Sequence, residues 1–321
     1  MEIEKIYVTG RYREQVASIK YQISRNSILQ WETTETPEKA SIILFFDCID
    51  HEVLSFTANK ILVRQEPKMV IPFNYDPKNL TKFDLIVNVG KSVDGIEKNI
   101  NWPQKINLRI SSQFSKSQSK AVLINSNLLS LDSDEMYSLR RTISYKSDDI
   151  DLYGYGWNKG MKSNMKALLI EVRKYIRNPL SIKAKGLKYY FRYQQNYKGS
   201  VDNKIHTMEN YRIAIVIENS LDYVSEKIFD SFSAGCITIY VGPDLNKYEI
   251  PRNLYIQAEP SKSGVKEAIE KAKKVDYAKW FSELESWFNS EAVFKSWSEE
   301  TFLLRLKEVI TNSNHFRPYL H

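Results

Sequence analysis

The stretch YRIAIVIENSLDYVSEKIFDSFSAGCITIYVG, residues 211–242, decides the fold. Residues 211–217 are a short apolar run rich in isoleucine, as in a strand that is buried on both faces of a parallel sheet. Residues 218–222 are mostly polar and predict a turn. Apolar side chains then recur at helical spacing until Gly235, a residue type that commonly ends a helix, and residues 237–241 form a second apolar run. The order strand, helix, strand predicts a βαβ unit of an α/β protein.

The turn after the first of these strands carries the polar side chains of the unit. In a parallel sheet such a turn lies at the carboxyl ends of the strands, where the following helix points unpaired backbone N–H groups at a ligand. Lys227 adds a positive charge there, and Glu226 and Asn219 offer groups that bond ribose or sugar hydroxyls. The pattern favours an anionic, hydroxyl-rich ligand such as a nucleotide sugar. An ordinary βαβ unit is the alternative, because few such units bind phosphate at this place.

Length and charge limit what the rest of the chain can be. Its 321 residues are long for one core and indicate two domains. The formal net charge of +7 suits nucleic acid, an anionic membrane surface or an anionic small substrate. Nucleic acid is the weakest of the three, because the sequence has no long Lys/Arg block and no zinc-finger or RNA-recognition signature. A peripheral contact with the inner face of a bacterial plasma membrane stays open. Residues 168–193 are rich in basic and aromatic side chains, which are suited to face an acceptor, a lipid head group or solvent.

The cysteines and histidines point to a reducing compartment and to no metal site. Cys48 and Cys236 lie in or beside apolar runs, so we expect buried free thiols. The four histidines are scattered and lack metal-ligand spacing with the cysteines. The first residues contain no signal-peptide apolar region, and no window approaches 18 apolar residues. We expect a cytoplasmic protein.

Residues 218–242 resemble the signature of the α-1,3/α-1,4-fucosyltransferases, glycosyltransferase family 10. The family pattern contains F-E-N-S, then Y-V-T-E-K, then A-G-x-[VI]-P-[IV]-Y-x-G. It is present here as E-N-S at 218–220, Y-V-S-E-K at 223–227 and A-G…Y-x-G at 234–242. Ser225 replaces the usual Thr, Thr238 replaces the usual Pro, and the gap before Tyr223 is short.

Weaker matches lie upstream of the signature. The phrase R-Q-E-P at 64–67 resembles the E-S-P or E-N-E segment of these enzymes, and D-L-Y-G-Y-G at 151–156 resembles their D-x-[YF]-G-x-G segment. The resemblance covers about residues 66–256 and is strongest over 197–242. The chain before residue 66 carries no match, as expected where acceptor-binding domains diverge.

The resemblance implies an α/β fold that is GT-B-like, with two Rossmann-like domains, a deep cleft between them and C-terminal helices crossing back. We expect an N-terminal acceptor-side domain at 1–102, a linker at 103–120, a nucleotide-sugar (donor) domain at 121–290, and a helical segment at 291–321 that packs back toward the N-terminal domain. Ser296 and Glu299 are spaced as a capping box for the last helix. Apolar runs predict strands of the first domain at 5–9, 40–46, 61–64 and 85–89.

The resemblance also implies an activity. We expect an inverting transfer of L-fucose from GDP-β-L-fucose to a hydroxyl of an oligosaccharide acceptor. An N-acetyllactosamine-type unit with an α-1,3 linkage is the family default, in bacterial surface glycan or O-antigen synthesis. Two other hypotheses stay open: a transferase that uses another nucleotide sugar, and a nucleotide-sugar-binding protein without catalysis. The sequence does not indicate an oligomeric state.

Seven residues are expected to form the site. By resemblance Glu66 is the general base, and Glu226 is the second catalytic carboxylate. The expected donor-binding residues are Arg140, Asn219, Ser220, Tyr223, Glu226 and Lys227. Arg141 is the alternative to Arg140 as the diphosphate ligand, because both lie on one predicted helix. These cations neutralise the departing GDP, so we expect neither a cofactor nor a divalent metal.

Overall fold

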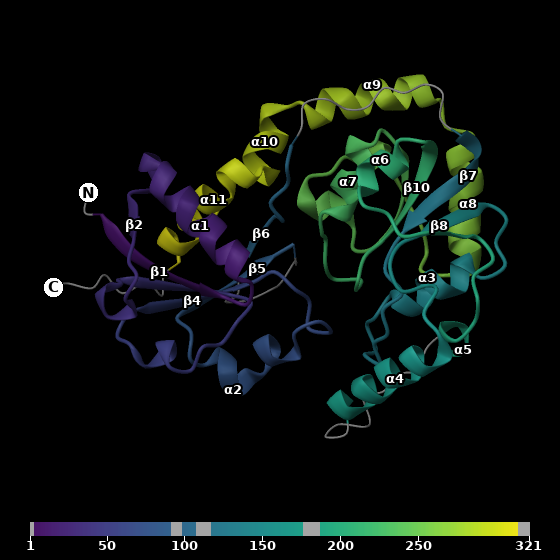
Figure 1. Cartoon of the computed structure of the whole chain (residues 1–321). Helices are drawn as coiled ribbons and strands as arrows, with labels where there is room; N and C mark the ends of the chain where they lie inside the picture. The colour runs from purple at the N-terminus through teal and green to yellow at the C-terminus, as the bar shows by residue number, and fades with distance from the viewer. Residues whose placement is uncertain (1–2, 91–97, 107–116, 176–186, 314–321) are drawn as a thin grey trace. The chain divides into compact units, whose positions relative to one another are not determined.

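A computed structural model describes residues 3–90, 98–106, 117–175 and 187–313. The chain divides into two compact units (Figure 1). The first unit is discontinuous and consists of Met1–Ile106 together with Glu291–His321. The second unit is Asn107–Ser290. Each unit is built on its own parallel sheet.

The first unit contains a six-stranded sheet in the order β2-β1-β3-β4-β5-β6, with every neighbouring pair parallel. The strands are β1 (Glu4–Gly10), β2 (Trp31–Thr33), β3 (Ile42–Phe46), β4 (Asn59–Arg64), β5 (Leu85–Val89) and β6 (Lys98–Ile100). The four strands predicted from apolar runs are confirmed as β1, β3, β4 and β5. The short strands β2 and β6 were not predicted.

Helices α1 (Arg13–Arg25) and α11 (Glu299–Thr311) cover one face of this sheet. They contribute Ile19, Ile23, Phe302, Leu303, Leu306 and Ile310 to the largest apolar cluster of the unit. The remaining α-helices of the unit are α2 (Pro77–Leu80) and α10 (Glu291–Trp297). Helix α11 therefore completes a core whose strands come from the other end of the sequence.

The start of α11 corrects the capping box expected at Ser296 and Glu299. The N-cap is Ser298, whose Oγ accepts a hydrogen bond from the backbone N–H of Thr301 at 3.2 Å. Ser296 lies inside α10, which continues to Trp297. A residue with helical neighbours on both sides cannot take the extended backbone of an N-cap, so the cap moves to the next serine.

The second unit contains another six-stranded parallel sheet, in the order β12-β11-β10-β7-β8-β9. The strands are β7 (Ser117–Ile124), β8 (Ile150–Tyr153), β9 (Tyr197–Gly199), β10 (Tyr211–Ile217), β11 (Ile237–Val241) and β12 (Tyr255–Gln257). The predicted bounds of β10 and β11 are confirmed. Strand β7 begins at Ser117, within the segment expected as a linker. From β7 the chain continues to β8 and β9 on one side, and from β10 it continues to β11 and β12 on the other. The boundary between the adjacent strands β7 and β10 is therefore the topological switch point of this sheet.

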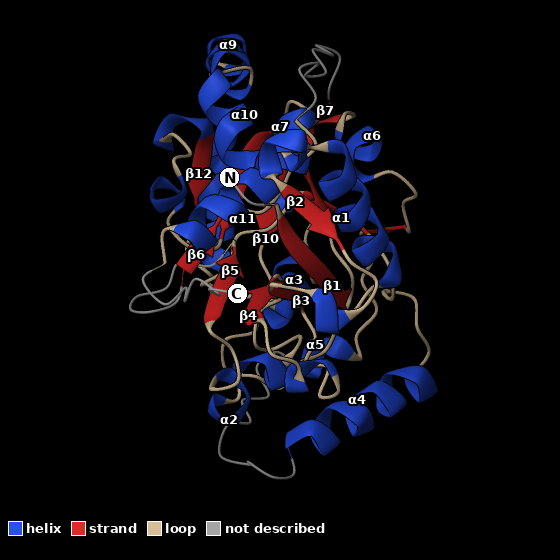
Figure 2. Ribbon diagram, turned by 90° about the vertical axis from the view of Figure 1, so that its left-hand side faces the viewer, coloured by secondary structure: helices blue, strands red, loops and turns tan. Residues whose placement is uncertain are grey.

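The second unit also contains α-helices, one of which extends away from the strands at the lower right of Figure 2. They are α3 (Tyr137–Ser144), α4 (Met161–Tyr175), α5 (Leu187–Tyr190), α6 (Lys204–Met208), α7 (Lys227–Ser233), α8 (Lys262–Lys273) and α9 (Tyr277–Phe288). The predicted stop at Gly235 is confirmed: its φ is +65°, and its N–H bonds the Phe232 carbonyl at 2.8 Å.

Both cysteines are free thiols. Cys236 is buried against the Tyr211 carbonyl, 3.2 Å from its Sγ, while Cys48 is only half-buried. Burial is the main cause that raises the pKa of Cys48 to about 11. Among the described helices, none combines the length and the apolar character that a membrane span requires.

Candidate functional site

Glu218 is the first residue after β10 and lies at the switch point of the second sheet. Its side chain is completely buried. Its carboxylate accepts hydrogen bonds from the Ser225 N–H at 3.0 Å and the Ser225 hydroxyl at 2.7 Å, and its Oε2 lies 3.3 Å from the Lys227 ammonium. The Tyr240 hydroxyl is 3.4 Å from Oε1. Glu218 therefore fixes the loop that leads from β10 into α7.

Lys227 is held at this edge of the sheet and keeps part of its side chain in contact with solvent. Its Nζ donates to the Ser225 hydroxyl at 2.7 Å and pairs with Glu218. The side chain is 17% exposed, against 0% for its partner. One buried carboxylate thus orients this cation at the carboxyl edge of the sheet.

Arg140 reaches the same edge from α3, the helix that follows β7. Its Nη2 donates to the carbonyls of Ile217 and Glu218 at 2.8 and 3.0 Å and to Asn219 Oδ1 at 2.9 Å. The side chain is 2% exposed, and its buried Nε has no hydrogen-bond partner among the described residues. Burial lowers the pKa of Arg140, and the nearby Tyr137 and Glu218 oppose this shift. The guanidinium therefore spans the switch point between β7 and β10.

Arg141 points elsewhere. Its Nη1 donates to the Leu128 carbonyl at 2.6 Å, and its guanidinium lies 5.2 Å from the centre of the Tyr190 ring. The side chain is completely buried, and burial lowers its pKa to about 10. Of the two arginines left open by the sequence, Arg140 is the one beside Asn219.

The other expected donor-binding residues of this loop differ in exposure. Asn219 is half-buried and bonded to Arg140, as described above. The Ser220 hydroxyl donates to Asp222 at 2.7 Å, and Ser220 also forms a bridge with Glu135. Tyr223 is only 3% exposed, so its side chain belongs to the packed interior in this conformation.

Glu226 is the expected site carboxylate of this unit, and its side chain is partly exposed. Its side chain is 37% exposed and lies 3.5 Å from the Lys204 ammonium, which also lies 3.7 Å from Asp230. Burial would raise the pKa of Glu226, but the charges of Lys227 and Lys204 outweigh it and the net shift is downward. Glu226 therefore stays a carboxylate at neutral pH. Lys204 completes the charge pattern and lies within residues 197–242, where the resemblance is strongest.

Glu66 belongs to the first unit and follows β4. It is half-buried. Its backbone N–H donates to Asp47 Oδ1 at 3.3 Å, and its carbonyl accepts from the Tyr75 hydroxyl at 2.9 Å. The backbone on both sides of the carboxylate is therefore anchored, as a positioned side chain requires.

Asp47 was missed by the sequence reasoning. It directly follows β3, is 2% exposed and has a φ of +50°. Its Oδ1 also accepts from the Gln65 N–H at 2.9 Å. Burial raises its pKa to about 6, against the opposing effect of the two N–H groups and of Arg11. An acid placed directly after the apolar run I-I-L-F-F was the available signal.

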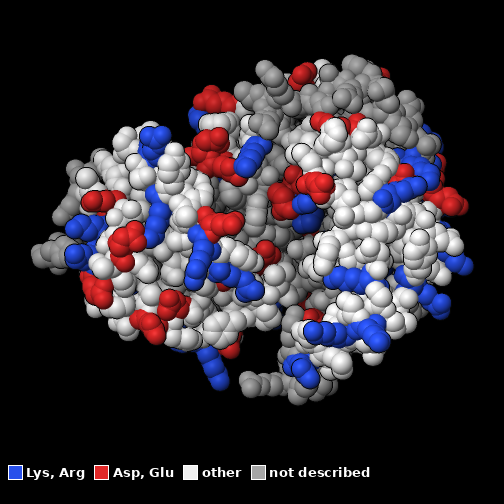
Figure 3. Space-filling view, in the orientation of Figure 1, with Lys and Arg blue, Asp and Glu red and all other residues white. Residues whose placement is uncertain are grey.

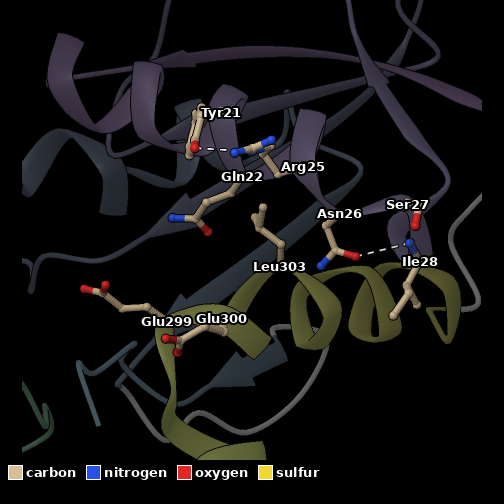
Figure 4. A pocket seen from close by; sticks show the side chains of 9 residues that line it. All are labelled: Tyr21, Gln22, Arg25, Asn26, Ser27, Ile28, Glu299, Glu300 and Leu303. Atoms are coloured by element: carbon tan, nitrogen blue, oxygen red, sulfur yellow. Dashed lines mark hydrogen bonds between the residues drawn. The ribbon is translucent and has the colours of Figure 1, made fainter. Parts of the chain in front are cut away.

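A pocket of about 420 Å³ in the first unit lies at residues that the sequence did not single out (Figure 4). It lies where the end of α1 meets the start of α11. Its lining residues are Tyr21, Gln22, Arg25, Asn26, Ser27, Ile28, Glu299, Glu300 and Leu303. Arg25 donates to the Tyr21 hydroxyl at 3.2 Å within this pocket. None of the expected site residues lines it. In the described part of the chain, no group of three or more His, Cys, Asp or Glu side chains is arranged to hold a metal ion.

Comparison with known proteins shows a shared fold. An alpha1,3-fucosyltransferase structure superposes with a TM-score of 0.54 at 11% identity, covering 99% of this chain and 93% of that chain. Anabaena Alr3699/HepE in complex with UDP gives 0.55 at 11% identity, covering 97% and 100%. WaaG, a glycosyltransferase involved in lipopolysaccharide biosynthesis, gives 0.51 at 9% identity, covering 96% and 100%. No family model and no curated protein matches the sequence.

The expected fold class is confirmed by these likenesses. The protein has two parallel six-stranded α/β sheets, and its structural neighbours are GT-B glycosyltransferases. Identities near 10% establish the architecture, and function has to be argued from the site.

Proposed function

We propose that this protein is an inverting glycosyltransferase that moves L-fucose from GDP-β-L-fucose to an oligosaccharide hydroxyl. An N-acetyllactosamine-type acceptor and an α-1,3 linkage are part of the proposal, as is a role in bacterial surface glycan or O-antigen synthesis. The observation that carries it is Lys227, a cation fixed by buried Glu218 at the carboxyl edge of β10. Open α/β sheets bind their ligands at this edge, at the switch point.

In the proposed reaction the acceptor oxygen attacks the anomeric carbon of fucose as the bond to GDP breaks. Negative charge then builds on the diphosphate. Lys227 neutralises it directly, and the buried guanidinium of Arg140 contributes a positive charge from beneath. Asn219 and Ser220 bond the sugar or phosphate oxygens, and Glu226 holds sugar hydroxyls. Tyr223 contributes after a side-chain rearrangement, since it is buried here.

Glu66 is the proposed general base and takes the proton of the acceptor hydroxyl. A positioned base contributes typically about 10²–10⁴-fold in rate. Glu66 suits the role because Asp47 and Tyr75 fix the backbone around it. The protein cations carry the charge of the leaving group, so the proposal includes no metal and no cofactor.

A transferase with another nucleotide sugar is the second candidate. The likeness to a protein crystallised with UDP supports it as much as the fucosyltransferase likeness supports GDP. Calorimetric titration with GDP, UDP and dTDP separates the two. Tight binding of UDP and weak binding of GDP would replace the GDP-fucose assignment.

The decisive experiment measures GDP release from GDP-fucose with N-acetyllactosamine as acceptor. We expect turnover by the wild type and a loss of roughly 100-fold or more in Glu66→Gln. Nucleotide binding should persist in Glu66→Gln and fail in Lys227→Met. Glu38→Gln and Lys247→Met are matched controls on exposed residues and should behave as the wild type.

Three results would change the proposal. Binding of GDP-fucose without turnover on any acceptor would favour a non-catalytic binding protein. Full activity in Glu66→Gln would remove Glu66 as the base while leaving the transferase assignment intact. Turnover lost in the two control variants would show that the losses reflect damaged folding instead of chemistry.

A further inference from the structure

Helix α4 turns polar side chains toward the protein. Asn164 and Glu171 are 7% and 4% exposed. The Asn164 amide donates to the Lys159 carbonyl at 3.3 Å, and the Glu171 carboxylate accepts from the Leu131 N–H at 3.4 Å. A helix on the surface of a globular protein usually packs its apolar stripe inward. Helix α4 departs from this pattern, because Asn164 and Glu171 share its inward arc with the half-buried Ala167 and Leu168.

The outward face of α4 carries an apolar stripe. We call the α4 stripe the side chains of Met161, Met165, Leu169 and Val172, which are 61%, 43%, 56% and 38% exposed. At 3.6 residues per turn they fall within an arc of about 80° and extend about 16 Å along the helix. Single exposed apolar residues are ordinary, whereas a contiguous stripe marks an interaction surface.

A row of cations borders the α4 stripe. It consists of Lys162, Lys166 and Arg173, all exposed, in the neighbouring arc of the helix. The one acid of α4 is Glu171, which is buried. Lys and Arg side chains gather along the lower edge of the second unit, the region of α4, with few Asp or Glu among them (Figure 3). Both ribbon views show α4 at the outer edge of its unit (Figures 1 and 2).

We propose that α4 docks the protein on an anionic membrane surface. The α4 stripe would lie at the boundary between head groups and acyl chains, and the cations would lie among the acidic head groups. A second copy of the chain fits this face less well, because pairing two such helices would bring the like charges of Lys162, Lys166 and Arg173 together. The charge of the face selects an anionic partner.

Docking through α4 would also bring the candidate site close to the bilayer. The loop before α4 is tied to the segment after β7, since Trp157 Nε1 donates to the Asn125 carbonyl at 2.6 Å and Asn127 Nδ2 to the Gly156 carbonyl at 3.2 Å. That segment lies at the same carboxyl edge of the sheet as Lys227. An acceptor carried on a lipid would then meet this edge, a consequence that rests on the proposed function, whereas the docking itself does not.

Sedimentation of the full chain with lipid vesicles tests the docking. We expect binding to vesicles of equal parts phosphatidylcholine and phosphatidylglycerol, little binding to pure phosphatidylcholine, and weakening by salt. Met165→Asp/Leu169→Asp should reduce binding about tenfold or more, because it places charge in the α4 stripe. Lys166→Glu should reduce it about fivefold or more, the order expected for one basic side chain at an anionic surface.

Matched controls separate α4 from the rest of the surface. Ile28→Asp changes an apolar side chain that is 74% exposed, and Lys266→Glu changes an exposed lysine on α8; both should bind vesicles as the wild type does. Equal binding to both vesicle types, or binding unaffected by the α4 variants, would overturn the proposal. A wild-type dimer that Leu169→Asp splits, without vesicle binding, would assign the face to a second copy instead.

Discussion

Glu218 and Lys227 form the least exposed ion pair around the candidate site. The carboxylate is fully buried, and two of its hydrogen bonds come from Ser225. Removing one partner of such a pair costs more than the pair itself contributes, because the other charge is left buried and unpaired. Stability and ligand binding are therefore both affected when Lys227 is changed, and a second substitution is needed to separate them.

Lys227→Met should destabilise the second unit by about 2 kcal/mol or more, as judged by urea unfolding. The double variant Glu218→Gln/Lys227→Met should recover most of that loss, because glutamine keeps the acceptor for Ser225 without a charge. Nucleotide binding, measured by calorimetry, should stay absent in both variants. Recovery of binding in the double variant would show that Lys227 acts only through folding.

Asp47 gives the first unit a pH-dependent stability. Its folded-state pKa of about 6 lies above the value of the unfolded chain because the carboxylate is buried. The group favours the folded state below about pH 4 and loses that contribution as pH rises through 6. Asp47→Asn removes this titration while keeping an oxygen for the N–H groups of Gln65 and Glu66.

We expect the unfolding free energy of Asp47→Asn to improve relative to the wild type between about pH 4 and 7. The relative change should be on the order of 3 kcal/mol, the equivalent of a shift of about two pKa units. Urea titrations at a series of pH values measure it. A constant difference between the two proteins across this range would contradict a raised pKa at Asp47.

At the scale of elements, the N-cap of α11 contributes to the stability of a helix that packs against the core of the first unit. Ser298 is fully buried, and its hydroxyl accepts from the Thr301 N–H. Ser298→Ala should lower stability by about 1 kcal/mol, and Ser298→Gly by only a few tenths, because glycine is itself a favoured N-cap residue whereas alanine is not. Thermal unfolding of the two variants checks this order. Equal losses would mean that the hydroxyl contributes by packing instead of capping.

Elements with strong apolar patterns were predictable from the sequence. Strands β10 and β11 are all but continuously buried, so their runs of Ile and Val mark both ends. Strands β2 and β6 are three residues long and lie at the edges of their sheet, where no pattern identifies them. Strand β7 begins with polar residues, S-Q-S-K, which resemble a linker.

The sequence placed the candidate site at a loop, but it did not predict the contacts of the side chains there. The motif located the loop after β10, and Lys227 and Glu226 do lie there. Glu218 is buried because the chain folds back so that Ser225 bonds its carboxylate. Tyr223 is buried by packing against the rest of the unit. No pattern in the neighbouring sequence predicts either contact. Asp47 accepts hydrogen bonds from Gln65 and Glu66, which follow the neighbouring strand β4. Their proximity can be known only from the order of the strands in the sheet.

At the scale of the whole molecule, the division into two units predicts a selective effect of nucleotide. A ligand that binds one unit stabilises that unit by mass action, by about 2.7 kcal/mol at a hundredfold excess over its dissociation constant. With GDP, amides of β10 and α7 should exchange hydrogen up to about 100-fold more slowly, while amides of β3 and β4 stay unchanged. Hydrogen exchange with mass spectrometry measures this, with dTDP as the control nucleotide. Protection of β3 and β4 alone would move the nucleotide to the first unit.

The discontinuous first unit has a consequence for how the protein matures during synthesis. Its sheet is translated early, but Phe302, Leu303, Leu306 and Ile310 of α11 are translated only after the whole second unit. At about 5–20 residues per second, the part of this sheet face that α11 covers stays exposed for many seconds, although α1 is already present. The second unit, being continuous, can fold as it emerges from the exit tunnel. The first unit can therefore complete its apolar core only after the whole second unit has been translated.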